Sequence, residues 1–135
     1  MISYNTTMNI EIKHGRVIDP ANGVDALQDV YIVDGRIAAL GQPPAGFHAE
    51  QVIDANGLVV APGLVDLSAR LREPGYEYKA TLESELDAAI AGGVTSLLCP
   101  PDTDPVLDEP GLVEMLVHRA RSLNQSHVYP LGALT

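Results

Sequence analysis

The chain has 135 residues with 8 basic and 18 acidic side chains. Its formal net charge of -10 argues against nucleic acid and anionic membranes as partners, since both require basic patches. The single cysteine, Cys99, rules out an internal disulfide. The sequence shows no signal-peptide pattern, and its apolar runs are far shorter than the roughly 20 residues of a membrane helix. We therefore expect a cytoplasmic protein with no membrane partner.

Short apolar runs separated by tight turns make up the first part of the chain, residues 1–61. Such runs flank the dipeptides His14-Gly15, Asp34-Gly35 and Asn56-Gly57. Dipeptides of this kind favour hairpins, because a type I′ turn requires positive φ at two successive residues. We therefore predict three hairpins in a small β-rich unit.

Strands and helices alternate in the second part, residues 62–135. The predicted elements are, in chain order, a buried strand at 64–67, a helix from about 79 to 92, a strand at 94–99, a helix that Asp108 caps with Pro110 in its first turn, and a strand at 128–131. This β-α-β-α-β series predicts parallel strands joined by crossover helices.

The third predicted strand lies close to the last residue given, Thr135. Parallel sheets are normally covered on both faces, and a bare edge strand pairs readily with another chain. We therefore expect this chain to be the N-terminal portion of a longer protein. The alternative is that a partner covers the open edge.

A set of landmarks, spread over about residues 8–135, resembles the dihydroorotases of the cyclic amidohydrolase superfamily. The landmarks are Gly57-Leu58-Val59-Val60-Ala61-Pro62-Gly63, Asp66, Leu71-Arg72-Glu73-Pro74-Gly75, Ala91-Gly92-Gly93-Val94-Thr95, Pro101-Asp102-Thr103 and Gly132-Ala133-Leu134-Thr135. Together they are far more specific than any one short motif.

The resemblance implies an α/β fold, in which a (β/α)8 barrel stands beside a small β-sandwich built from both chain ends. Residues 1–61 would be a β-rich, partial piece of that sandwich. Residues 62–135 would supply the first three strands and two helices of a metal-dependent-hydrolase TIM barrel. Barrel enzymes place their sites at the C-terminal ends of strands, which here are residues 68–72 and 99–103.

Four residues stand at positions where the resemblance implies a site. Ser68 and Arg70 replace two histidines that bind a zinc pair in the family. Serine is a poor zinc ligand, and arginine is no ligand, because it keeps its proton and its positive charge. Arg72 matches the arginine that grips the substrate carboxylate, and Asp102 replaces an asparagine that contacts substrate. The family's remaining site residues would lie beyond Thr135.

We therefore predict no catalytic residue, no bound metal and no cofactor in this chain, with Arg72 and Asp102 as vestigial substrate-binding residues. Two interpretations of Arg70 stay open. It is either an ordinary arginine paired with Asp66, Glu73 or Asp102, or a cation that fills the vacated metal position and holds the nearby acids together.

The resemblance extends to inactive bacterial dihydroorotase homologues that associate with aspartate transcarbamoylase. It implies a non-catalytic, homo-oligomeric subunit that supports assembly of this enzyme of pyrimidine biosynthesis. The main alternative is a metal-dependent cyclic amidohydrolase that opens a dihydroorotate-, hydantoin- or allantoin-like ring with metal-activated water. A third hypothesis is a regulatory module that binds a carboxylate metabolite through Arg72 without turning it over.

Overall fold

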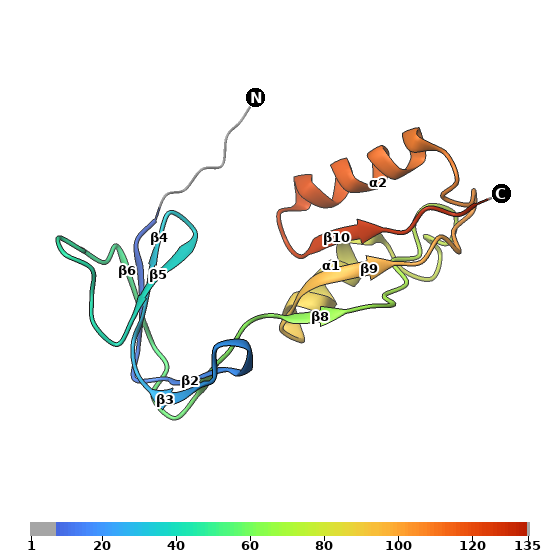
Figure 1. The fold of residues 1–135 in the computed structure, drawn as a ribbon. Helices are drawn as coiled ribbons and strands as arrows, with labels where there is room; N and C mark the ends of the chain where they lie inside the picture. Colours follow the sequence, from blue (N-terminus) through green and yellow to red (C-terminus); the bar gives the residue numbers. More distant parts are fainter. Residues whose placement is uncertain (1–7, 135) are drawn as a thin grey trace. The chain divides into compact units, whose positions relative to one another are not determined.

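The computed structural model describes residues 8–134 (Figure 1). The chain divides into two compact units between Pro62 and Gly63. Over residues 8–62 the first unit consists of strands and one short 3-10 turn, whereas the second unit alternates strands and helices.

Two small sheets form the first unit. The larger sheet has the strand order β5-β4-β1-β6, and its strands are β1 (Ile10–Lys13), β4 (Val30–Val33), β5 (Arg36–Leu40) and β6 (Gln51–Asp54). The smaller sheet has the order β3-β2-β7, with β2 (Arg16–Asp19), β3 (Val24–Leu27) and β7 (Val59–Val60).

One of the three predicted hairpins is confirmed. Strands β4 and β5 pair antiparallel around Asp34-Gly35, and both turn residues have positive φ, at 52° and 69°. The hairpins predicted at His14-Gly15 and Asn56-Gly57 are wrong, because each dipeptide carries the chain from one sheet to the other. A hairpin that the sequence analysis missed joins β2 to β3 through the 3-10 turn η1 (Pro20–Asn22).

A corner between the two sheets replaces the missing hairpins. Strand β1 runs parallel to β6, and after the corner β2 runs parallel to β7, so two neighbouring chain segments turn together. The Ala55 N–H donates to the Lys13 carbonyl at 2.8 Å within the corner. A Cβ at Gly15 would lie 2.5 Å from Val60 Cγ2, so only glycine allows this close approach.

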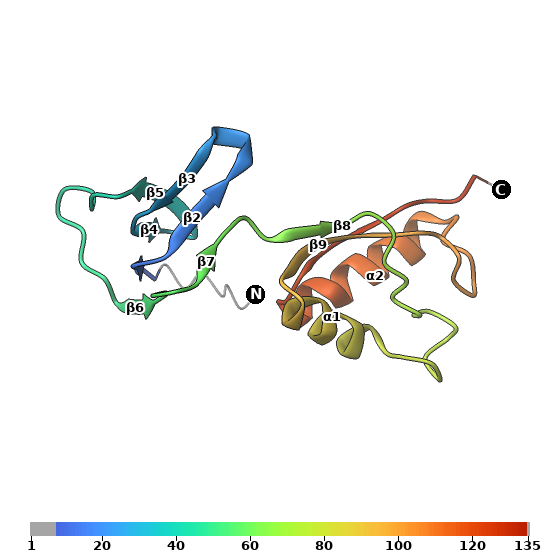
Figure 2. The same cartoon turned by 90° about the horizontal axis from the view of Figure 1, so that it is seen from below.

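A three-stranded parallel sheet with two helices forms the second unit. The sheet has the order β10-β9-β8, with β8 (Leu64–Asp66), β9 (Val94–Cys99) and β10 (His127–Pro130), and the helices are α1 (Leu82–Ala91) and α2 (Pro110–Leu123). Figure 2 shows the two helices side by side. The predicted β-α-β-α-β series with parallel strands is confirmed.

Capping residues set the helix limits. Helix α1 begins three residues later than predicted, because Thr81 is its N-cap and exchanges side-chain and backbone hydrogen bonds with Ser84 in a capping box. It ends before Gly92-Gly93, as predicted. Helix α2 has Pro110 in its first turn, but its N-cap is Glu109 rather than Asp108.

A single apolar cluster fills the space between the helices and the sheet. Its buried members are Leu71, Leu82, Leu86, Leu97, Cys99, Leu107, Leu116, Ala120 and Val128. The prediction of a buried first strand is wrong for this chain, because Leu64, Val65 and Leu67 are largely exposed. Strand β8 is an edge strand of the sheet, whereas α1 packs on its neighbour β9.

Candidate functional site

The candidate site lies where β8 and β9 end. Because parallel strands end at the same edge of a sheet, the segments that follow them are neighbours. The Ala69 N–H donates to the Leu98 carbonyl at 2.9 Å and ties the segment after β8 to β9. This edge brings together the two stretches in which the sequence predicts site residues.

Arg70 and Asp102 form an ion pair across this edge. The Arg70 Nε lies 2.6 Å from Asp102 Oδ2, a charge-assisted hydrogen bond. The two side chains are 52% and 49% exposed. Of the three carboxylates considered as partners for Arg70, the structure pairs it with Asp102. An ion pair as exposed as this contributes only ~0–1 kcal/mol to stability.

Ser68 is exposed, and its backbone is fixed by the preceding aspartate. The Ser68 N–H donates to Asp66 Oδ1 at 2.9 Å. Asp66 therefore orders the turn that ends the strand, a role that aspartate side chains often have in turns. The Asp66 landmark has a local structural explanation that does not involve a metal.

Arg72 has a left-handed backbone conformation, with φ of 63°. Such a conformation costs a non-glycine residue on the order of 1–3 kcal/mol, so surrounding contacts must hold it. The Arg72 carbonyl accepts a hydrogen bond from the Tyr76 N–H at 2.8 Å, which closes a turn directly after it.

A cavity of about 400 Å³ lies beside this segment. Ser68, Arg70 and Arg72 line it, together with Glu85 of α1. Asp102 is not among the described residues that line it. The structure thus brings three of the four predicted site residues to one cavity and joins the fourth to Arg70.

Glu73 has a role that the sequence analysis did not predict. Its side chain is 4% exposed, its Oε2 accepts a hydrogen bond from the Leu82 N–H at 3.0 Å, and its Oε1 forms an ion pair with Arg119 of α2. The carboxylate therefore caps the N-terminus of α1, where a negative charge is favourable. Its place next to Arg72 was the only available signal, and no periodicity points to Arg119.

Two glycines of the landmarks, Gly63 and Gly75, stand where another residue approaches the backbone closely. Gly75 has φ of 99°, and a Cβ there would lie 2.9 Å from the Asp104 carbonyl carbon and overlap its oxygen. The Asp104 N–H also donates to the Pro74 carbonyl at 3.1 Å. A Cβ at Gly63 would overlap the side chain of Thr95. At Gly63 and at Gly75, the close contact therefore leaves no room for a side chain.

The side chains at the end of β8 do not fit a zinc ion. A serine hydroxyl and a guanidinium that keeps its proton stand at the two positions where the resemblance implies histidine ligands. Over residues 8–134, no group of three or more His, Cys, Asp or Glu side chains is arranged to hold a metal. Cys99 is buried, and burial raises the pKa of its thiol above the usual value.

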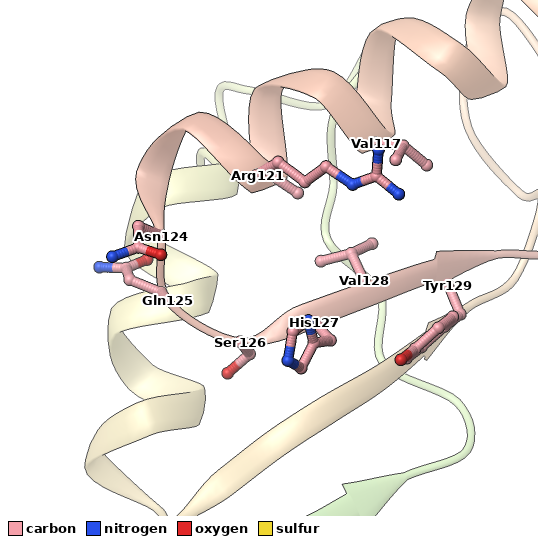
Figure 3. Close-up of a pocket in the computed structure, with 9 residues that line it drawn as sticks. Val117, Arg121, Asn124, Gln125, Ser126, His127, Val128 and Tyr129 are labelled. Atoms are coloured by element: carbon pink, nitrogen blue, oxygen red, sulfur yellow. The ribbon is translucent and has the colours of Figure 1, made fainter. Parts of the chain in front are cut away.

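A second, smaller cavity of about 180 Å³ lies between the end of α2 and β10 (Figure 3). Arg121, His127 and Tyr129 are among its lining residues, and none of the predicted site residues reaches it. In the part of the chain that the structure describes, no helix has the length and apolar character needed to span a membrane.

Comparison with known proteins identifies the family. The sequence profile of the dihydro-orotase-like family matches residues 57–135. The chain belongs to this dihydroorotase-like family. It is 56% identical over 128 residues to a dihydroorotase-like protein of Pseudomonas aeruginosa and 48% identical over 128 residues to a dihydroorotase of Solibacter usitatus. Each alignment covers 95% of this chain and 30% of the relative, so the chain spans under a third of their length.

Solved structures confirm the fold class. The L-hydantoinase (dihydropyrimidinase) of Arthrobacter aurescens superposes with a TM-score of 0.79 at 22% identity, over 93% of this chain and 28% of that one. The dihydroorotase-like chain therefore has the predicted architecture, a β-rich segment followed by the first β-α-β-α-β units of an amidohydrolase TIM barrel.

Proposed function

We propose that the protein containing this chain is a non-catalytic dihydroorotase-like subunit that supports assembly of aspartate transcarbamoylase in de novo pyrimidine biosynthesis. The observation that carries the non-catalytic part is the ion pair between Arg70 and Asp102 at the strand ends. A fixed positive charge stands where the family resemblance implies a metal ligand. Coulomb repulsion disfavours a divalent cation beside it, and Asp102 is already engaged by Arg70.

The pattern of kept and changed residues supports the same proposal. Gly63, just before β8, and Glu73 and Gly75, in the loop after it, make close contacts that constrain the backbone, and all three match the landmarks. Ser68 and Arg70, by contrast, lack the chemistry of zinc ligands. A chain with this pattern keeps the backbone of the dihydroorotase-like fold without side chains suited to bind zinc, as a scaffold subunit would.

The partner is the part of the proposal that rests on the family resemblance. We further propose that the subunit is cytoplasmic and homo-oligomeric and binds no cofactor. We also propose that this acidic subunit contacts neither nucleic acid nor membrane. The net charge of -10 supports the last two points, because both of those partners select basic surfaces.

Co-purification tests the proposal directly. The full-length protein is expressed with and without the transcarbamoylase catalytic chain, and the mass and activity of the transcarbamoylase are measured in both cases. We expect a mixed complex without ring-opening activity and with less than one zinc per subunit. A transcarbamoylase that is fully assembled and active without its partner would refute the scaffold role. Tightly bound zinc with hydrolysis of dihydroorotate would instead support a metal-dependent cyclic amidohydrolase.

One observation favours an additional role in carboxylate binding. Arg72 lines the 400 Å³ cavity, and its guanidinium can bind a carboxylate through two parallel hydrogen bonds. Calorimetry of the full-length protein with dihydroorotate and with carbamoyl-aspartate tests this role. The Arg72→Gln variant is the control, and equal heats for variant and parent would exclude binding through Arg72.

A further inference from the structure

The loop that starts at Arg72 is tied to a helix that lies outside the cavity. Glu73 follows Arg72 directly, and its buried carboxylate contacts both the first residue of α1 and Arg119 of α2. Among the described residues that line the cavity, none belongs to α2. We infer that Arg119 is a positioning residue, which holds Arg72 at the cavity by way of Glu73.

The first step of this inference is the conformation of Arg72. A left-handed φ of 63° is unfavourable for arginine, so this backbone stays in place only if its neighbours fix it. On the C-terminal side, the next residue is Glu73, which is 3% exposed. Anchoring this side chain in the protein interior therefore fixes the adjacent peptide of Arg72.

The second step is the closure of the loop between Glu73 and Leu82. Its two ends meet, because the Glu73 carboxylate accepts the Leu82 N–H. Inside the loop, the Lys79 N–H donates to the Tyr76 carbonyl at 2.9 Å, and the Lys79 Nζ lies 4.9 Å from the centre of the Tyr76 ring. The Glu73 carboxylate therefore joins the two ends of this compact loop, which is also tied to the Asp104 N–H through the Pro74 carbonyl.

The third step is the charge balance of that carboxylate. A buried carboxylate without a partner is strongly unfavourable, and removing one partner of a buried ion pair is strongly destabilising. Arg119 provides the positive charge, and 55% of its side chain is exposed, so it reaches Glu73 from the surface. Removing the charge of Arg119 should therefore expel Glu73 and release the peptide that carries Arg72.

Hydrogen exchange of the full-length protein, followed by mass spectrometry, measures this release. In Arg119→Gln we expect peptides covering residues 72–82 to exchange about tenfold faster or more, while the β9 peptide, residues 94–99, keeps its rate. Arg119→Lys keeps the charge and should restore most of the protection. Arg121→Gln, on the same helix, is the matched control and should leave the 72–82 peptides unchanged.

A double variant separates positioning by charge from mere packing. Glu73→Gln combined with Arg119→Gln removes both charges, and the amide oxygen can still accept the Leu82 N–H. We expect its 72–82 peptides to exchange more slowly than those of Arg119→Gln alone, a non-additive result that a packing role would not produce. If Arg119→Gln fails to fold, the double variant and Arg119→Lys are compared with the parent in its place.

Three outcomes would overturn the inference. They are an unchanged rate for the 72–82 peptides in Arg119→Gln, an equal acceleration of the 94–99 peptide, and a double variant that is as fast as or faster than the single one. The measurement needs neither transcarbamoylase nor a metabolite, so its result is independent of the proposed function.

Discussion

Replacing Arg70 with alanine distinguishes the two interpretations of this residue. Its guanidinium contacts Asp102 at 2.6 Å, but both side chains are about half exposed, at 52% and 49%. Water therefore screens the pair and replaces most of the lost interaction when one partner is removed. We expect Arg70→Ala to lower the free energy of unfolding by no more than ~1 kcal/mol.

The assay is urea unfolding of the full-length protein at low and high salt, with a double-mutant cycle of Arg70→Ala and Asp102→Ala. The coupling energy of the cycle should be below ~1 kcal/mol and should decrease in 1 M salt, as expected for exposed pairs. Arg16→Ala is a matched control, because Arg16 contacts Asp25 at 2.7 Å with 56% and 53% exposure. Its effect on stability should be similar.

A loss well beyond this range would refute the reasoning. A coupling above ~2 kcal/mol that resists salt would mean that Arg70 acts as an internal cation that holds the strand ends together. It would also mean that the pair is desolvated in the full-length protein.

Three further predictions concern other parts of the chain. Gly75→Ala should lower the free energy of unfolding by about 3 kcal/mol or more in thermal unfolding, because the new Cβ overlaps the Asp104 backbone. Gly93 also has positive φ but lies in open space, so Gly93→Ala should cost only ~1–2 kcal/mol. Equal losses in the two variants would exclude the overlap as the cause. Hydrogen bonding by Arg16 lowers the pKa of Asp25, so the stability this pair adds is present above the ordinary aspartate pKa of about 4 and is lost as the pH falls through the lowered value. NMR titration of the Asp25 carboxyl should show its pKa rising toward the ordinary value in Arg16→Gln, and no change would contradict the assignment. Cys99 is 1% exposed, and burial raises the pKa of its thiol. A thiol reagent should therefore label this cysteine slowly in the native protein and quickly in urea. Rapid labelling of the native protein would show that the core is open at Cys99.

The sequence was most informative where local chemistry decides the structure. Asp34-Gly35 forms the predicted hairpin, because positive φ at both residues is a property of the turn itself. The same reasoning failed at His14-Gly15, where the left-handed residue bends a strand from one sheet into the other. The chain bends at His14-Gly15 instead of forming a hairpin because β1 pairs with β6, a strand that is distant in sequence.

The candidate site shows the same division. Its place at the strand ends followed from the order of elements, and the resemblance to the family pointed to Ser68, Arg70, Arg72 and Asp102. The choice of Asp102 as partner for Arg70 required the geometry of two neighbouring strands. The role of Glu73 could not be predicted, because its partner Arg119 lies on a separate helix, and tertiary packing decides which loop residue meets that helix.

The corner of the first unit has a consequence for how that unit folds. Ile12 pairs with Ile53 and Val17 with Val60, so the first strands of the unit are completed by its last ones, about forty residues later. Contacts of such long sequence separation carry a high loop-closure cost and form slowly. During synthesis, the β4–β5 hairpin can form early, but the larger sheet cannot be complete until β6 has left the ribosome, and the smaller sheet cannot be complete until β7 has done so.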